Sequence, residues 1–354
     1  MFLTIVSFIF VLGVLITIHE LGHFLVAKKV GIKVERFSIG FPPYIFNRKK
    51  GETDYSIGLI PLGGFVKMAG ENPEEEATGA AYEFSSKTVG QRAAVIFAGP
   101  FMNYILALVI MIGIFMFGGE PQFDPDHVRV GEVTEGDPAF NAGIKTDDMI
   151  IAINDINVNN FDSLRSIVYP RPNEEVKVTW VSGSDTISAP IVTKAEEVPN
   201  LEGGVDTIGM IGFQQKAISY KTFGFFESIK LGFITTHQIV WGTVDFVQKL
   251  IRTKISSKLI GGPFFIAQQS GKEARKGPTS LFYFMALLSV NLAVLNVLPI
   301  PVLDGGHLVF LLMEKIKGSP VSIKSRMVAQ QVGVVALLSL ILYVTYNDIL
   351  RLFN

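Results

Sequence analysis

Residues 2–29 read FLTIVSFIFVLGVLITIHELGHFLVAKK. From Phe2 to Ile18 the segment is apolar and uncharged, and the run His19-Glu20-Leu21-Gly22-His23 follows it, with Lys28 beyond. A helix needs about 20 apolar residues to cross the hydrocarbon core of a bilayer. The segment therefore predicts a membrane span with two histidines and a glutamate near its end. A cleaved signal peptide is the competing interpretation, but the basic n-region and the small-residue cleavage site are missing.

Three further stretches are long and apolar enough to span a membrane: Ala93–Gly118, Gly277–Leu303 and Met327–Asn347. Hydrophobic residues make up 49% of the chain and charged residues 18%, against about 25% charged in typical soluble domains. The mean hydropathy is +0.40. The sequence thus predicts a polytopic α-helical membrane protein with four transmembrane helices.

Charge and cysteine content exclude several classes of site. The net charge is −1 and no dense basic run occurs, so no nucleic-acid partner is expected. The chain has no cysteine, which rules out disulfides and thiolate metal ligands. Any metal ion must therefore be held by histidine, aspartate or glutamate.

Two connecting segments are basic, and their charges predict the orientation of the chain. One extends from Ala27 to Arg92 and the other follows Leu303. Positively charged loops stay in the cytoplasm, so both termini and the long middle segment are expected outside. The basic residues of the two segments are Lys28, Lys29, Lys33, Arg36, Arg48, Lys49, Lys50, Lys67, Lys87 and Arg92, and Lys315, Lys317, Lys324 and Arg326.

The middle segment divides into a folded module and a connecting part. Glu120 to about Lys194 alternates short apolar runs with turn signals, and it includes a predicted helix at 162–168 and a half-buried strand at 176–181. This pattern predicts a small α+β domain. The composition of Glu196–Gly209 indicates a linker. The predicted domains are residues 1–118, 120–195, 196–276 and 277–354.

Residues 223–252 are apolar but interrupted by charges. A fifth span would bury those charges at a cost of several kcal/mol. An amphipathic helix at the membrane interface costs less, and we expect that arrangement.

The sequence His19-Glu20-Leu21-Gly22-His23 has the H-E-x-x-H spacing. On a helix, residues four apart share a face, so both imidazoles can bind one ion. Glu20 lies beside them and can take a proton from a water that the ion activates. Histidine occurs only 5 times in the chain, which makes a chance match improbable.

A catalytic zinc ion usually has three protein ligands, and Asp304 is the strongest candidate for the third. It follows two helix-breaking prolines in the run Asn296–His307 and precedes Gly305 and Gly306. His307 is a weaker alternative ligand. An ordinary helix cap is the other interpretation of Asp304.

The chain resembles the site-2 protease family of intramembrane zinc metalloproteases, and within it the bacterial regulator-of-sigma-E protease type. The resemblance implies that His19, His23 and Asp304 bind one zinc ion per chain, that Glu20 is the general base, and that Asn296 positions the substrate backbone or stabilises the oxyanion. It rests on the runs His19–His23, Ala98–Asn103 and Asn296–His307, the last of which matches N-x-x-P-x-P-x-L-D-G-G-H.

In this family the loop after the first span forms a β-hairpin that enters the membrane and pairs with extended substrate. Asp54–Ile60 alternates and Pro61–Met68 follows it, so Gly63, Gly64 and Phe65 are candidate substrate-binding residues. A purely structural cytoplasmic hairpin is the alternative.

The middle module resembles a single bacterial PDZ domain through residues 136–154. The resemblance implies that it lies outside the cell membrane, where it binds peptide C-termini or filters substrates by size.

The function implied is hydrolysis of peptide bonds in transmembrane segments of single-span proteins, such as anti-sigma factors or remnant signal peptides. The active site would face the cytoplasmic side of a bacterial inner (plasma) membrane, with the lipid bilayer as a further partner. A catalytically inactive PDZ-containing scaffold and a metal-ion transporter are the alternatives. Glu20 argues against the scaffold, because a structural site needs no carboxylate beyond its ligands. A single H-E-x-x-H run, the lack of an inverted repeat of the spans and a large extracytoplasmic module argue against the transporter.

Overall fold

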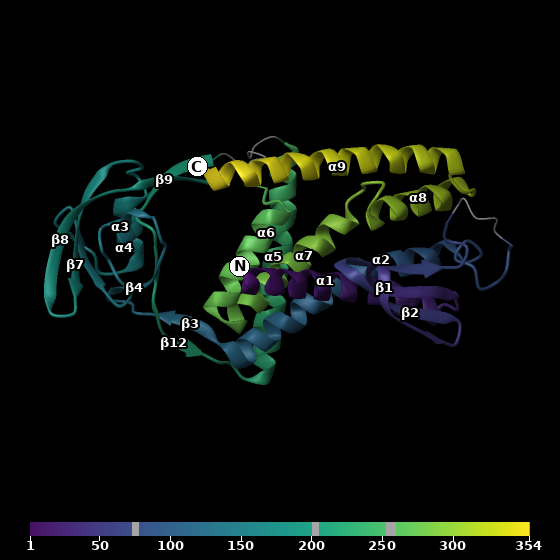
Figure 1. Cartoon of the computed structure of the whole chain (residues 1–354), viewed down its shortest axis with the longest axis horizontal. Helices are drawn as coiled ribbons and strands as arrows, with labels where there is room; N and C mark the ends of the chain where they lie inside the picture. The colour runs from purple at the N-terminus through teal and green to yellow at the C-terminus, as the bar shows by residue number, and fades with distance from the viewer. Residues whose placement is uncertain (73–77, 200–204, 253–259, 354) are drawn as a thin grey trace. The chain divides into compact units, whose positions relative to one another are not determined.

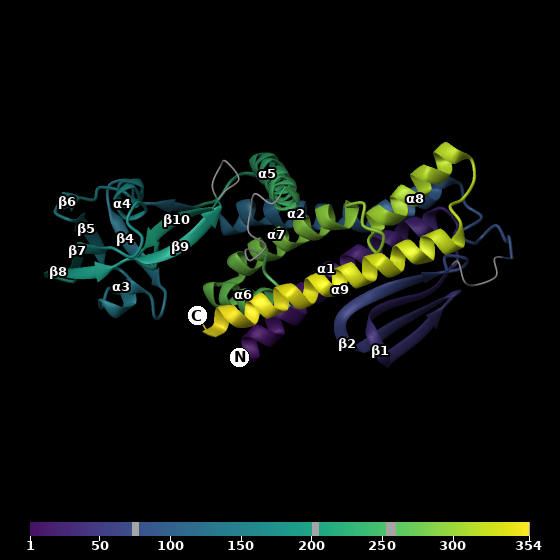
Figure 2. The same cartoon turned by 90° about the horizontal axis from the view of Figure 1, so that it is seen from above.

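The protein is described from a computed structural model, which covers residues 1–72, 78–199, 205–252 and 260–353. The described residues form two compact units. The first comprises 1–114, 225–247 and 260–353, and the second comprises 115–224 and 248–252. Figures 1 and 2 show the elements of each unit in two views.

Within the described residues, four helices are long and apolar enough to cross a membrane, as the sequence predicts. The first three, α1, α2 and α7, pack against one another in the first unit, and Val11, Leu15 and Met285 form a buried cluster between α1 and α7. A capping box formed by Thr88 and Gln91 starts α2. The four helices are α1 (Phe2–Lys29), α2 (Val89–Gly113, extended by the π-helical turn Ile114–Gly118), α7 (Pro278–Val297) and α9 (Ile323–Phe353).

Three more helices are described in the first unit: α5 (Phe225–Ile251), of which the residues up to Val247 belong to it, α6 (Pro263–Lys276) and α8 (Asp304–Lys317). α5 is the helix predicted at 223–252, and it is not among the candidate membrane spans. α6 was not predicted from the sequence; its residues are polar on average, although it packs on α1 and α7.

The hairpin after α1 is a sheet that folds back on itself. Strands β1 (Val34–Lys50) and β2 (Thr53–Met68) pair in two registers, because residues 36–39 have partners both at 64–67 and at 54–57. The segments 44–50, 53–58, 34–39 and 64–68 therefore lie side by side in that order, and Figure 2 shows the bend in β2. This sheet packs on the end of α1 through a buried cluster of Ala27, Ile32, Val34, Val66, Met68 and Val95.

The second unit is built on a sheet in the order β11-β4-β5-β7-β8, with β6 paired to β5. Its core surrounds Trp180, which is 1% exposed, and includes Leu164 of the short helix that the sequence predicts. The elements are β3 (Glu120–Phe123), β4 (Val128–Val133), α3 (Pro138–Asn141), β5 (Met149–Ile153), β6 (Ile156–Asn157), α4 (Phe161–Val168), β7 (Glu175–Ser182), β8 (Asp185–Val192), β9 (Lys194–Pro199), β10 (Val205–Met210), β11 (Phe213–Gln215) and β12 (Ala217–Lys221).

The structure differs from the predicted linker at Glu196–Gly209. Strands β9 and β10 pair there, for example through Glu196 and Ile208, while residues 200–204 lie outside the described residues. β11 then pairs with β4 and β12 with β3, so the module continues well beyond the predicted boundary at 195. These strands were not predicted, because they contain acidic residues and Pro199 and their pairing depends on backbone hydrogen bonds and not on an alternating apolar pattern.

Candidate active site

Helix α1 presents both histidines of the H-E-x-x-H run on one face. The Nε2 atoms of His19 and His23 lie 3.1 Å apart, and His19 is only 9% exposed. Asp304, the first residue of α8, approaches from the other side of the site. Its Oδ2 lies 3.2 Å from Nε2 of His19, and its Oδ1 lies 3.7 Å from Nε2 of His23.

The break between α7 and α8 delivers Asp304 to this position. α7 ends at Val297, and residues 298–303 form an irregular segment before α8 begins. A Cβ at Gly305 would lie 2.1 Å from the Leu298 carbonyl oxygen, and one at Gly306 would lie 2.3 Å from the Ile300 carbonyl oxygen. Only glycine permits so tight a turn at these two positions, because any side chain would collide with the backbone.

The donor set fits a zinc ion. The ligand atoms of His19, His23 and Asp304 all lie within 4.8 Å of one another. Two atoms at roughly 2.0–2.1 Å from a tetrahedral zinc ion lie about 3.3 Å apart, close to the separations of 3.1, 3.2 and 3.7 Å found here. The buried Oδ2 of Asp304 has no hydrogen-bond partner, as expected of an atom placed to receive a cation. His307, the weaker candidate, is not part of this cluster.

The Nδ1 atoms of both histidines also have hydrogen-bond partners. Nδ1 of His23 lies 2.8 Å from the Val95 carbonyl oxygen, which can only accept a hydrogen bond, so Nδ1 of His23 carries the proton. That tautomer leaves the Nε2 lone pair free for a metal ion.

Asn103 on α2 is the hydrogen-bond partner of Nδ1 of His19. Its amide nitrogen lies 3.2 Å from Nδ1 of His19, while its buried Oδ1 has no partner. Exchanging the amide nitrogen and oxygen, which are distinguished only by their hydrogen bonds, places Oδ1 where it accepts from Nδ1 of His19. Asn103 is fully buried, and its carbonyl oxygen accepts a hydrogen bond from Ser289 at 2.7 Å.

Two glycines let α1 and α2 approach closely beside the histidines. A Cβ at Gly22 would lie 2.2 Å from the Ala98 carbonyl oxygen, and one at Gly99 would lie 2.4 Å from Nε2 of His23. Sequence reasoning assigned no role to Gly99 or Asn103. The signal was present, since both belong to the run Ala98–Asn103 that carried part of the resemblance.

The last segment of the sheet brings backbone groups to Glu20. A Cβ at Gly64 would lie 3.5 Å from Cγ of Glu20, and the Val66 N–H interacts with the Glu20 carboxylate. Residues of an antiparallel strand alternate in the direction of their backbone groups, so Gly64 and Val66 both present theirs to the free edge. Of the other candidates in this strand, Phe65 stacks on Phe41, and Gly63 lies against the same ring.

Asn296 is not brought into the cluster. It is half-buried near the end of α7, and among the described residues no hydrogen bond or ion pair joins it to the histidines, Glu20 or Asp304.

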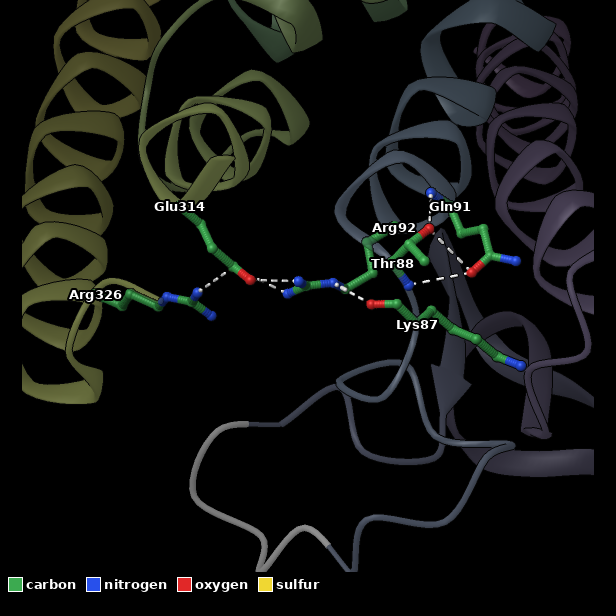
Figure 3. A network of polar contacts seen from close by, with 6 residues as sticks. All are labelled: Lys87, Thr88, Gln91, Arg92, Glu314 and Arg326. Atoms are coloured by element: carbon green, nitrogen blue, oxygen red, sulfur yellow. Dashed lines mark hydrogen bonds and ion pairs between the residues drawn. The ribbon is translucent and has the colours of Figure 1, made fainter. Parts of the chain in front are cut away.

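A buried ion pair fixes the far end of α8. Arg92 of α2 binds Glu314 of α8 through its two terminal nitrogens, Nη1 at 3.1 Å and Nη2 at 2.5 Å. Both residues are 8% exposed. Figure 3 shows Glu314 between Arg92 and Arg326 of α9, the latter at 3.6 Å. The Nε of Arg92 also donates to the Lys87 carbonyl oxygen at 3.1 Å. The helix that begins with Asp304 is therefore tied to α2 as well as to α7.

Comparisons with known proteins relate the chain to a family of peptidases. The sequence profile of peptidase family M50 matches residues 7–340. The chain is 31% identical to the regulator of sigma-W protease RasP of Bacillus subtilis, over 99% of both chains. It is 33% identical to the zinc metalloprotease RasP of Geobacillus kaustophilus, over 99% of this chain and 98% of that protein.

Among solved structures, a crystal structure of the PDZ domain of the SdrC-like protein from Listeria monocytogenes is similar to part of the chain. It is 19% identical, covers 27% of this chain and 92% of its own, and has a TM-score of 0.22.

Proposed function

The chain belongs to peptidase family M50, and is a zinc metalloprotease of the site-2 type with several membrane-spanning helices; we propose that it hydrolyses peptide bonds within the transmembrane segments of single-span proteins. The proposal rests on the arrangement of the ligand cluster, Glu20 and the strand edge at one site. A cluster of two histidines and an aspartate lies beside a non-ligating glutamate and the free edge of a β-strand, at the end of an apolar helix.

In the proposed site His19, His23 and Asp304 hold one zinc ion, which when bound supplies Lewis-acid chemistry to a water molecule and a carbonyl group. Asn103 and the Val95 carbonyl oxygen orient the two imidazoles. Glu20 accepts the proton of the attacking water at its carboxylate and passes it to the leaving nitrogen. Asn296 remains a proposed contact to the substrate backbone or the oxyanion.

The free edge of β2 supplies hydrogen-bond partners for the backbone of an unwound transmembrane substrate. A helix uses its amide groups in its own hydrogen bonds, so it must unwind before a carbonyl can be attacked. In the bilayer, the freed groups need new partners. The outward backbone groups of Gly64 and the carbonyl group of Val66, whose N–H contacts Glu20, provide them by strand addition next to Glu20. Gly63 and Phe65 flank this pairing site.

The orientation follows from the charges of the connecting segments. The basic segments before Arg92 and after Leu303 support an active site near the cytoplasmic side of a bacterial inner membrane. The second unit then lies outside as a PDZ domain that binds peptide C-termini or filters substrates by size. Anti-sigma factors and remnant signal peptides are substrates of the required single-span kind.

The proposal is tested with the full chain in proteoliposomes and a tagged single-span substrate. We expect cleavage by the wild type and none by Glu20→Gln or Asp304→Ala. Zinc analysis separates the two roles, since Glu20→Gln should keep one zinc per chain while Asp304→Ala loses it. A fully zinc-loaded wild type that cleaves none of several substrates would favour an inactive scaffold. Zinc flux into the vesicles would favour a transporter.

A further inference from the structure

The outer segment of the folded-back sheet, residues 44–50, has no part in the proposed chemistry. It forms the edge opposite to residues 64–68, and among the described residues it pairs only with 53–58. Ile45 and Phe46 are 67% and 50% exposed, and Arg48, Lys49 and Lys50 follow them on the same exposed strand. The segment thus changes along its length from exposed apolar side chains to basic ones.

Two contacts with α1 show how the sheet lies relative to the first span. At the hairpin tip, Glu52 binds Lys28 at 2.5 Å. At the other end, a Cβ at Gly64 would lie 3.6 Å from Ile16. Lys28 follows Ile16 by twelve residues, a rise of about 18 Å along an α-helix. The sheet therefore runs alongside α1, and its tip lies level with the basic end of that helix.

The direction of the sheet along α1 accounts for the change from apolar to basic residues along the outer segment. The exposed apolar residues of the outer segment lie at the depth of the apolar part of α1. The basic residues lie between the level of Phe24, which contacts Tyr55 across from Arg48, and that of Lys28 near the end of the helix. Basic side chains at this level meet the phosphate groups of the cytoplasmic leaflet, which carries anionic lipid.

The basic end of the segment also contains a shaped site. Phe46, Arg48 and Lys50 alternate along the strand and so share one face, and Tyr55 lies directly across from Arg48. These residues line an open pocket of about 430 Å³. Tyr55 is held in place because its ring contacts Phe24 of α1, with centroids 6.0 Å apart.

The charges in this pocket are uncompensated within the described part of the chain. Other basic residues of this sheet have acidic partners, since Arg36 faces Asp54 at 3.8 Å and Lys67 faces Glu35 at 3.2 Å. Arg48 and Lys50 have no acidic partner among the described residues. A pocket lined by two cations, Phe46 and Tyr55, next to the exposed Ile45, fits an anionic headgroup with apolar chains.

We propose that Arg48, Lys50, Phe46 and Tyr55 form a binding site for the headgroup of an anionic phospholipid of the cytoplasmic leaflet. The guanidinium of Arg48 and the ammonium of Lys50 bind the phosphate oxygens. The acyl chains lie against Phe46 and the apolar end of the outer segment. This lipid also covers the backbone groups of an edge strand that has no protein partner among the described residues. The inference does not depend on the protease activity.

The test uses the full chain in phosphatidylcholine nanodiscs that contain a minor fraction of spin-labelled lipid. Electron paramagnetic resonance gives the association constant of labelled phosphatidylglycerol relative to labelled phosphatidylcholine. We expect the wild type to prefer phosphatidylglycerol, and the variant Arg48→Gln/Lys50→Gln to lose that preference by about tenfold or more, because each basic residue near an anionic surface contributes to binding.

The matched control is Lys29→Gln/Lys49→Gln, which removes the same charge nearby. Lys29 is exposed at the end of α1, and Lys49 points to the opposite face of the sheet from Arg48. This variant should keep most of the lipid preference. Equal losses in both double variants would overturn the proposal in favour of diffuse charge attraction. Displacement of the labelled lipid by inorganic phosphate would overturn it in favour of a free-anion site. No lipid preference in the wild type would also overturn it. Unchanged zinc content in all variants verifies that they are folded.

Discussion

The two elements that supply the proposed metal ligands reach the site by different means. α1 contributes His19 and His23 through helical spacing alone, and its position is set by the close crossing with α2 at Gly22 and Gly99. α8 contributes Asp304 after a broken turn, and its far end is tied to α2 by a buried ion pair. A site can thus be half encoded in local sequence and half in contacts between distant residues. The two halves should fail differently when they are disturbed.

The largest effect is expected from the α8 half. Arg92→Leu leaves the Glu314 carboxylate buried with only the more distant Arg326, and removing one partner of a buried pair costs about 3–5 kcal/mol. We expect a clear loss of thermal stability in detergent and a lower zinc content, measured by calorimetry and atomic absorption. The exchange Arg92→Glu/Glu314→Arg restores part of both if the pair itself matters. Lys317→Gln, an exposed change on the same helix, is the control and should alter neither.

An intermediate effect is expected where α1 and α2 cross. Gly99→Ala places a Cβ against both histidines, and overpacking of this kind costs about 1–3 kcal/mol. Because the clash is with the ligands themselves, zinc should be lost before the fold is. Gly13→Ala in α1, where nothing lies within 4 Å of the new Cβ, should be neutral or stabilising by up to about 1 kcal/mol. A zinc-replete Gly99→Ala protein would show that this crossing is not what positions the histidines.

The smallest effect on the fold, and the most informative one, concerns Asn103. Removing the hydrogen bond to His19 by Asn103→Leu should weaken zinc binding by about 10–100-fold, as measured by competition with a chelator. Asn103→Asp keeps an acceptor for the Nδ1–H of His19 and should retain most of the affinity. If Asn103→Asp is as weak as Asn103→Leu, the amide donates to His19, and the proposed tautomer is wrong.

The sequence predicted the α1 half well because its information is local. The apolar run, the histidines four residues apart and the adjacent Glu20 all lie in one helix. Asp304 was also a candidate, since prolines and glycines around a lone carboxylate are visible in the sequence. The pairing of Arg92 with Glu314 was not predicted, because the two residues are 222 positions apart and each is an ordinary charge at a helix end.

The remaining differences have similar causes. β9 and β10 carry too few apolar residues for strand periodicity, so their pairing was missed. The double register of β1 and β2 was missed because the alternation that marks a strand does not say how many neighbours it has. Asn103 was noticed only as part of a motif, since a buried amide and an exposed one look alike in a sequence.

The folded-back hairpin has a consequence for the choice of substrate. Residues 36–39 are paired on both sides, so an incoming chain can add only at an outer segment, and beside Glu20 it meets backbone groups at Gly64 and Val66. Every residue except proline offers the same backbone donor. An enzyme that reads its substrates in this way is indifferent to most of their amino-acid identities and sensitive to how easily the helix comes apart. Its specificity would then depend on the local stability of the substrate helix. A mutation distant from the cleaved bond could make a protein that is otherwise not cleaved into a substrate.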